Sequence, residues 1–206
     1  MKIVAFTDLH GSAAAFAKLK HKINRYKPDI IICCGDFTFF EQGMKQTLQQ
    51  INKLGKNVYV VPGNHESEKE TKQACKTFPN ITFVNKEIIT IKNINFLFHG
   101  GGGFYSNDGK TKTNDEKQFD AFVKRNKSKF SKKIVFVTHA PPWNTKLDYL
   151  AWFGKHVGSV SYRQFIDEYK PVLALSGHLH ETFKEKQKIG KTLLSNPGPD
   201  GMVYSI

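Results

Sequence analysis

Residues 2–11 read KIVAFTDLHG, an apolar run rich in β-branched side chains that gives way to polar ones. This pattern predicts a buried β-strand, with Asp8 and His10 just beyond its end. The same pattern recurs at 28–36 (PDIIICCGD) and 57–66 (NVYVVPGNHE). Apolar residues at helical spacing fill the intervening segments, 12–26 and 41–55. The order β-α-β-α-β predicts parallel strands, as in α/β proteins.

The rest of the chain mixes this pattern with signals of antiparallel pairing. Residues 80–100 contain short β-rich runs separated by Asn-Lys and Lys-Asn pairs, which predict hairpins. The tail, 182–206, predicts two or three antiparallel strands. Further buried strands are predicted at 134–138 and 172–176, and further helices at 113–130 and 159–170.

The composition is that of an ordinary globular protein, with 39% apolar and 24% charged residues among 206. The length and the lack of a linker-like segment predict one domain over residues 1–206. The first apolar run is too short for a secretory signal, and no stretch is long enough to span a membrane. Cys33 and Cys34 adjoin in a predicted strand, and Cys75 makes the count odd. This usage favours a packing role for the thiols and a reducing, cytoplasmic location.

The formal net charge is +13, from 31 Lys and Arg against 18 Asp and Glu. Such a charge favours anionic partners, nucleic acid among them, and speeds their arrival. A lysine-rich surface that serves only to keep the protein solvated is the alternative interpretation.

Polar residues follow five predicted strands at the points where the strands end. The exits read TDLHG, CGDF, PGNHE, THAPP and SGHLH, and they carry Asp8, His10, Asp36, Asn64, His65, Glu66, His139, His178 and His180. Each residue alone would be an ordinary loop residue. Because the carboxyl ends of parallel strands share one edge of a sheet, where ligands bind, we expect these side chains to converge.

So many carboxylates and imidazoles together indicate a metal site. The set contains oxygen and imidazole ligands but no thiolate, which suits Mn²⁺, Fe, Zn²⁺, Co²⁺ or Ni²⁺ better than Mg²⁺ or Ca²⁺. Seven candidate ligands favour two ions about 3.5–4 Å apart that share a carboxylate. His178 and His180 would point to the same side of an extended segment, so that each faces one metal.

The motifs DLH, GDF, GNHE, THAPP and GHLH, in this order, resemble those of the calcineurin-like metallophosphoesterase superfamily over nearly the whole chain. The resemblance implies a four-layer α-β-β-α sandwich of two mixed sheets. It implies one metal held by Asp8, His10, Asp36 and His180, and another held by Asp36, Asn64, His139 and His178, with Asp36 bridging. His65 would lie beside the substrate phosphate and protonate the leaving group or stabilise charge.

The resemblance also implies hydrolysis of a phosphoester by in-line attack of a metal-bridging hydroxide, with two divalent ions, Mn²⁺ foremost, as cofactors. Phosphoprotein phosphatases of the superfamily carry arginines after the second and third strands. Here these stretches read GDFTFFEQG and PGNHES, without arginine. The chain is therefore more similar to the small prokaryotic-type phosphodiesterases, and a small phosphoester or nucleotide is the expected substrate.

Two other functions remain open on the sequence. A nuclease is favoured only by the basic charge, and a non-catalytic interaction scaffold would keep the fold. The chain has every ligand position, which argues against the scaffold.

Three further segments allow two interpretations each. Gly100–Gly103 either presents N–H groups to a phosphate or hinges a lid, or it lets the backbone cross closely beneath other loops. His99 before it could reach the site, but an ordinary loop histidine is the favoured interpretation. The aromatic residues of 141–156 either stack on a nucleobase or pack that loop against the domain. Residues 110–133 form either a solvated face or a patch that steers an anionic polymer, through Lys110, Lys112, Lys117, Lys124, Arg125, Lys127, Lys129, Lys132 and Lys133.

Overall fold

The computed structural model describes residues 1–105, 108–131 and 133–206. Its helices are α1 (Ala13–Tyr26), α2 (Met44–Asn52), α3 (Glu68–Cys75), α4 (Asn114–Arg125) and α5 (Val160–Tyr169), with 3-10 turns η1 (Lys127–Ser131) and η2 (His180–Thr182). Its strands are β1 (Lys2–Phe6), β2 (Ile30–Cys33), β3 (Val58–Val60), β4 (Ile81–Phe83), β5 (Glu87–Ile91), β6 (Ile94–His99), β7 (Ile134–Thr138), β8 (Tyr149–Leu150), β9 (Lys155–His156), β10 (Leu173–Leu175), β11 (Lys186–Ile189), β12 (Thr192–Ser195) and β13 (Met202–Ser205).

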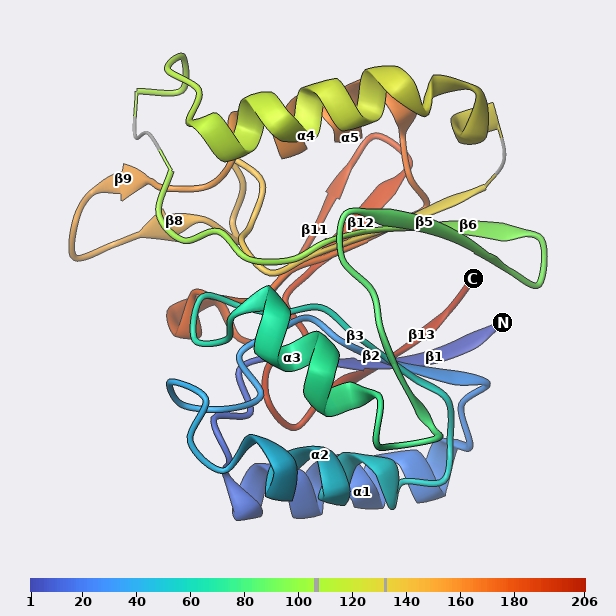
Figure 1. The fold of residues 1–206 in the computed structure, drawn as a ribbon. Helices are drawn as coiled ribbons and strands as arrows, with labels where there is room; N and C mark the ends of the chain where they lie inside the picture. Colours follow the sequence, from blue (N-terminus) through green and yellow to red (C-terminus); the bar gives the residue numbers. More distant parts are fainter. Residues whose placement is uncertain (106–107, 132) are drawn as a thin grey trace.

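Two mixed sheets face each other. The first has the strand order β13-β1-β2-β3-β4, in which β1 to β4 are parallel and β13 is antiparallel to β1. The second has the order β11-β12-β10-β7-β6-β5, parallel except for its two edge strands. Helices α1 and α2 cover the outer face of the first sheet, and α4 and α5 cover the second (Figure 1). The predicted α-β-β-α sandwich is therefore confirmed.

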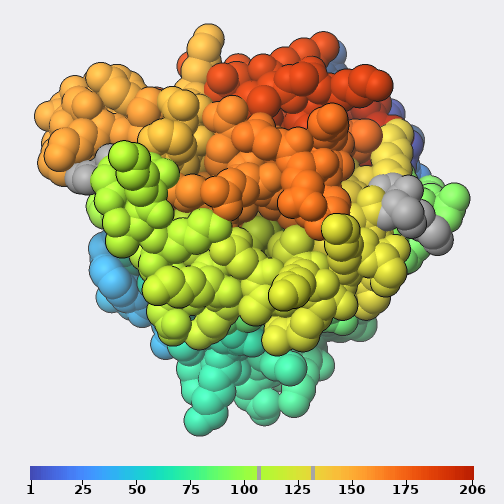
Figure 2. All heavy atoms as spheres, turned by 90° about the horizontal axis from the view of Figure 1, so that it is seen from above, coloured from blue at the N-terminus to red at the C-terminus, as the bar shows by residue number. Residues whose placement is uncertain are grey.

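Alternation of side chains along each strand builds the layers. In β1, Ile3 and Ala5 pack between the two sheets, whereas Val4 and Phe6 pack under α1 and α2. A third cluster of apolar residues fills the space between the second sheet and α4 and α5. Figure 2 shows these two helices side by side on the surface, with the β8–β9 ribbon projecting at one end. The central strands of both sheets are thus buried on both faces, which fits the near-continuous apolar runs in the sequence.

The central part of the chain differs from the prediction. Only β5 and β6 form a hairpin within 80–100, whereas β4 pairs in parallel with β3 and extends the first sheet. Helix α3 was not predicted, although Ser67 accepts a hydrogen bond from the backbone N–H of Glu70 and so caps it. This helix has only eight residues, and just Thr71 and Cys75 are buried, so its apolar periodicity is short.

The parallel strands of both sheets end at the same side of the molecule, while the two termini lie at the opposite side (Figure 1). The loops that follow β1, β2, β3, β7 and β10 therefore meet along one edge. Among the described residues, no helix combines the length and the apolar character needed to cross a membrane.

Candidate metal centre

Sharp turns follow the strands that carry the predicted ligands. Asp8, His10, Asp36 and His178 all adopt left-handed backbone conformations, with φ of 51°, 45°, 51° and 72°. This conformation is costly for a residue with a side chain, on the order of 1–3 kcal/mol each, and such strain concentrates at functional sites. The turns bring chain segments that are up to 170 residues apart into hydrogen-bond distance.

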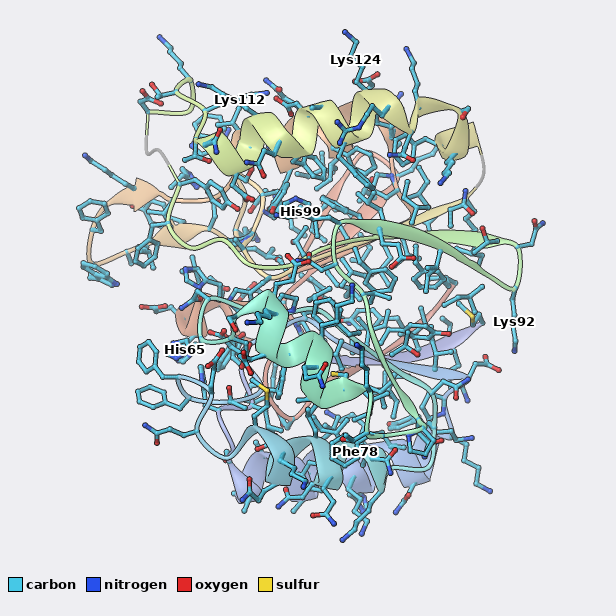
Figure 3. All side chains as sticks on the ribbon, in the orientation of Figure 1. His65, Phe78, Lys92, His99, Lys112 and Lys124 are labelled. Carbon is cyan, nitrogen blue, oxygen red and sulfur yellow. The ribbon has the colours of Figure 1, made fainter. Side chains whose placement is uncertain are left out.

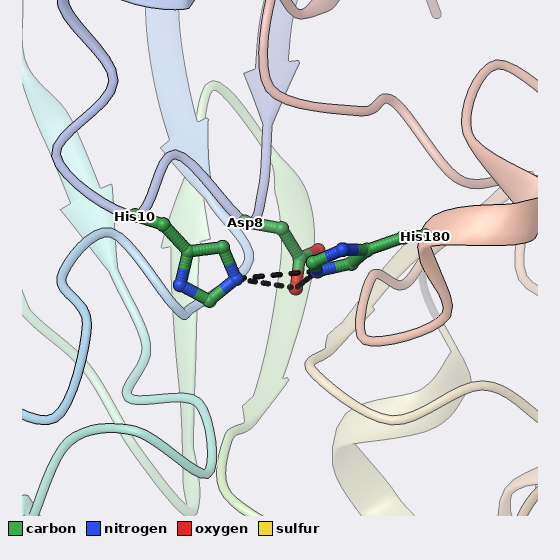
Figure 4. A group of neighbouring side chains, drawn as sticks. All are labelled: Asp8, His10 and His180. Carbon is green, nitrogen blue, oxygen red and sulfur yellow. Dashed lines mark hydrogen bonds and ion pairs between the residues drawn. The ribbon is translucent and has the colours of Figure 1, made fainter.

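Asp8, His10 and His180 form the first ligand group, and their ligand atoms all lie within 4.8 Å of one another. Asp8 Oδ1 is 3.9 Å from His10 Nε2 and 3.6 Å from His180 Nε2, and the two imidazole nitrogens are 3.2 Å apart (Figure 4). The side chains point toward one another from the exits of β1 and β10 (Figure 4). This arrangement can hold one cation.

Asp36, His139 and His178 form a second group, whose ligand atoms also lie within 4.8 Å of one another. Asn64 joins them, because its Oδ1 lies 2.9 Å from His139 Nε2 and 2.8 Å from His178 Nδ1. Asp36 Oδ2 lies 3.4 Å from His139 Nε2 and 4.0 Å from His10 Nε2. Asp36 is thus close to both groups, as a bridging carboxylate has to be.

The hydrogen bonds around the imidazoles fit metal binding. His10 Nδ1 lies 2.9 Å from the carbonyl oxygen of Thr38, and His139 Nδ1 lies 2.9 Å from that of Cys34. A carbonyl can only accept, so each Nδ1 carries a proton, and in the neutral ring each Nε2 offers its lone pair to the site. Buried Asp8 Oδ1 has no hydrogen-bond partner within the described chain, whereas Oδ2 accepts from Thr7 Oγ1 and from the backbone N–H of His178. An unpartnered buried carboxylate oxygen at this point fits a cation.

The electrostatics of the site favour positive charge beside its carboxylates. Burial would raise the pKa of Asp36, but His139 outweighs it and lowers that pKa to about 2. Burial would likewise lower the pKa of His139, yet Asp36 raises it to about 9. The pKa of Asp8 is also lowered, because the partners His180 and His139 outweigh its burial. Both carboxylates are therefore ionised and available to a cation at neutral pH.

His65 stands next to the two groups. Its backbone N–H donates to Asp36 Oδ1 at 2.9 Å, and its Nε2 lies 3.8 Å from Asp36 Oδ2. Its Nδ1 accepts a hydrogen bond from the backbone N–H of Phe40 at 3.2 Å. In the neutral ring the proton is therefore on Nε2, which faces the ligands. Figure 3 shows His65 at the edge where the strands end.

Glu66 has a structural role that the sequence did not reveal. Its buried carboxylate accepts hydrogen bonds from the backbone N–H groups of Asp36, Thr38 and Gly63 at 2.8–3.0 Å, and from Thr38 Oγ1 at 2.7 Å. It thereby fastens the exit of β2 to the exit of β3. The backbones also come very close there, because a Cβ on Gly63 would overlap Asp36 Oδ1. The only signal in the sequence was the place of Glu66 at a strand exit.

His178 and His180 reach the two groups by a route other than the one predicted. The segment is not extended, since His178 is left-handed and His180 begins η2. The left-handed residue turns the chain and the 3-10 turn carries His180 across to Asp8. Buried Asn196 stabilises η2, because its Nδ2 donates to the Leu179 carbonyl at 3.1 Å and to Thr182 Oγ1 at 3.0 Å.

The remaining segments lie mostly apart from this cluster. Gly100 lets the backbone cross closely over Val61 and Pro62, where a Cβ would overlap both. His99 is not a loop residue: it ends β6, is buried and bonds Tyr162 through Nδ1 at 2.7 Å. The cysteines are free and buried in the core.

The aromatic and basic segments are exposed in part. Tyr149, Trp152 and Phe153 are exposed on the β8–β9 ribbon, whereas Trp143 is half-buried. Figure 3 shows Lys124 on α4 and Lys112 in the segment just before that helix, both away from His65. Lys132 lies outside the described residues.

A four-layer sandwich with acids and imidazoles gathered from five strand ends is the architecture of the metal-dependent phosphoesterases. The chain belongs to the calcineurin-like phosphoesterases, which it matches over residues 1–182. Uncharacterized protein MJ1162 of Methanocaldococcus jannaschii is 32% identical over 206 residues, which cover 97% of this chain and 88% of that protein.

Two more distant similarities agree with this family. "Probable glycerophosphodiester phosphodiesterase GpdQ" of Arcobacter nitrofigilis is 24% identical over 158 residues, covering 75% of this chain and 57% of its own length. The crystal structure of phosphopantetheinyl hydrolase from Mycobacterium tuberculosis has a TM-score of 0.71 at 15% identity, covering 96% of this chain and 88% of that one. At such identity the structural similarity shows the fold alone.

Proposed function

We propose that this phosphoesterase is a dinuclear, metal-dependent phosphodiesterase. The observation that carries the proposal is the position of Asp36, whose carboxylate forms one compact ligand group with His139 and His178 and another with His10 and His65. One ion would be held by Asp8, His10, Asp36 and His180, and the other by Asp36, Asn64, His139 and His178. The mixed oxygen and imidazole set supports Mn²⁺ first, with Fe, Zn²⁺, Co²⁺ or Ni²⁺ as alternatives.

Two bound cations would supply a nucleophile from water at neutral pH and neutralise charge on the phosphoryl group. The residues of the chain orient the reaction around them. Glu66 and the Thr38 and Cys34 carbonyls fix the ligands in place, so the site is organised before a substrate arrives. His65 presents Nε2–H beside Asp36, where it can stabilise charge on the departing oxygen through a hydrogen bond and, when the ring is protonated, donate a proton to it.

A diester fits the charge of the site better than a monoester. Among the described residues, Asp8 and Asp36 form ion pairs with histidines and none with Lys or Arg. A monoester dianion gains more than a diester monoanion from additional cationic side chains. The description of the Arcobacter relative as a diesterase supports the same preference.

The nuclease alternative has less support. The only feature that favours a nuclease is the net charge of +13. Lys112 and Lys124, in the α4 region, lie far from His65 (Figure 3). The complete ligand set opposes a non-catalytic scaffold.

Three free, buried cysteines support the proposed cytoplasmic location.

Hydrolysis assays after loading with each of the five metals test the proposal. Bis(p-nitrophenyl) phosphate should be hydrolysed faster than p-nitrophenyl phosphate, with about two ions per chain by elemental analysis. Faster monoester turnover would overturn the diester preference, and one ion per chain at full activity would overturn the dinuclear site. Cleavage of an oligonucleotide in preference to both small esters would favour the nuclease.

A further inference from the structure

Two phenyl rings stand beside the ligand cluster, exposed to solvent. Phe39 is 51% and Phe40 is 63% exposed, whereas Phe37, two residues earlier, is completely buried in the core. The two rings contact each other edge to face, with centroids 4.9 Å apart. Adjacent exposed phenyl rings in contact with a polar site indicate a binding surface more than incidental exposure.

Both rings pack against His65. The ring centroid of His65 is 4.2 Å from that of Phe40 and 5.1 Å from that of Phe39. Phe39 also reaches His10, at 6.1 Å and nearly perpendicular. The apolar surface is therefore continuous with the candidate metal centre through the rings of His65 and His10.

The turn that carries the two phenyl rings has a backbone conformation that its residues disfavour. Phe39 pairs with Gln42 across a tight turn, and the two residues between them, Phe40 and Glu41, both have positive φ, 47° and 63°. Turns with two left-handed residues favour Asn-Gly, since both residues tolerate this conformation, whereas phenylalanine does not. The neighbouring loop fixes the turn: Ser67 N donates to Glu41 Oε1 at 2.7 Å, and Phe40 N donates to His65 Nδ1.

A strained turn that exposes two phenyl rings serves binding better than folding. We infer that Phe39 and Phe40 bind the leaving group, so that the substrate is a phosphoester whose departing alcohol carries a flat aromatic group, such as an aryl ring or a nucleobase. This inference rests on the proposed phosphoesterase function. The rings lie beside the proton donor of that proposal, where the departing oxygen has to be.

Phosphonates that cannot be hydrolysed measure this preference directly. Phenylphosphonate and methylphosphonate present the same anion and differ only in the group beside it, and titration calorimetry with Mn²⁺-loaded protein gives both affinities. Phenylphosphonate should bind about tenfold more tightly, because a stacked ring contributes on that order. Phe39→Ala and Phe40→Ala should each reduce the ratio, and the double variant should bring it close to unity. Methylphosphonate affinity and metal content should not change.

Three variants serve as controls. Phe40→Tyr keeps a flat ring and should keep the preference, whereas Phe40→Leu keeps apolar character without a flat face and should lose most of it. Tyr26→Ala removes another exposed ring, at the far end of α1, and should change nothing. Helix α1 has 14 residues and is about 20 Å long, and Tyr26 is at the end opposite to the exit of β1.

The outcomes separate this inference from the function on which it rests. If both phosphonates bind with equal affinity, or the double variant keeps the preference, the aromatic leaving group is wrong and the phosphoesterase proposal stands. If neither binds and no ester is hydrolysed, both fail. A change in molecular mass of the Phe39 and Phe40 variants with an unchanged preference would assign the rings to a contact between subunits and overturn the inference.

Discussion

His10 Nε2 and His180 Nε2 lie 3.2 Å apart, although 170 residues separate them in the chain. The proton of His10 is on Nδ1, where the Thr38 carbonyl accepts it, so its Nε2 is a free lone pair. His180 approaches it with a pKa raised by its hydrogen bond to Asp8. Either a proton or a cation can satisfy this arrangement, and a cation would bring both nitrogens and Asp8 Oδ1 into one coordination shell.

Metal ions should therefore stabilise the folded chain. Ligands from both sheets meet only in the native state, and an ion at 100 times its dissociation constant adds about 2.7 kcal/mol to the free energy of unfolding. Thermal unfolding with Mn²⁺ or with a chelator measures the difference. Asp8→Asn should abolish most of the shift, and Asp167→Asn, on the outside of α5, should retain it. An equal shift in the Asp8 variant would contradict the assignment.

Asp36→Asn tests the bridging role. An amide has one oxygen and no charge. We therefore expect turnover to fall at least about 100-fold, as when a group that stabilises charge in the transition state is removed from an enzyme. Unfolding in urea should change little, because the Glu66 network that holds this loop remains. The measurements are kcat/KM and bound metal per chain, and near-normal values of both would refute the bridge.

His65→Ala should separate proton donation from metal binding. Two ions should remain bound while turnover falls about 10²–10⁴-fold, most for esters whose leaving group has a high pKa. A plot of log kcat against the leaving-group pKa gives the readout, since it should be steeper for the variant. Loss of metal would show instead that His65 is a ligand.

Glu66→Gln should weaken the metal centre by disturbing the loops that carry its ligands. One carboxylate oxygen becomes an NH₂ group that faces backbone donors, which costs about 1–3 kcal/mol of stability. Metal affinity should fall about 10–100-fold, as for other residues that support ligands. Glu70→Gln, exposed on α3, is the matched control for both urea unfolding and metal titration. If the Glu66 variant matches it, the carboxylate does not organise the loops.

His99 should make the metal-free fold sensitive to acid. Burial lowers its pKa to about 4, against about 6.5 in an unfolded chain. Between these values the unfolded state binds more protons, so stability falls as pH decreases, by up to about 1.4 kcal/mol per pH unit. Urea unfolding with chelator at pH 7.5 and 4.5 should show a smaller loss for His99→Gln than for the unaltered chain. An equal loss would place the acid sensitivity elsewhere.

Much of the fold was predictable because the strands of an α/β sandwich are buried on both faces. Continuous apolar runs such as Ile30–Cys33 are then visible without periodicity, and their polar exits mark one edge. Strand pairing was less accessible: the parallel partner of β4 depends on contacts that no local pattern encodes. The exposed rings of Phe39 and Phe40 were missed for the same reason, since only the tertiary structure distinguishes them from buried Phe37.

Which residues form the site was easier to predict than how their side chains are oriented. Strand ends decide which residues approach, whereas the turn at His178 and the buried carboxylate of Glu66 decide how they are oriented. Both depend on hydrogen bonds between loops far apart in sequence, such as the one from His178 N to Asp8 Oδ2 at 3.0 Å.

Four of the proposed ligands occupy backbone conformations that suit glycine or asparagine better. At these positions, the side chain that metal binding requires is therefore one that the backbone conformation disfavours. In a descendant of this chain that no longer had to bind ions, we would expect smaller residues to replace these ligands. The fold would then become more stable while the catalytic activity was lost.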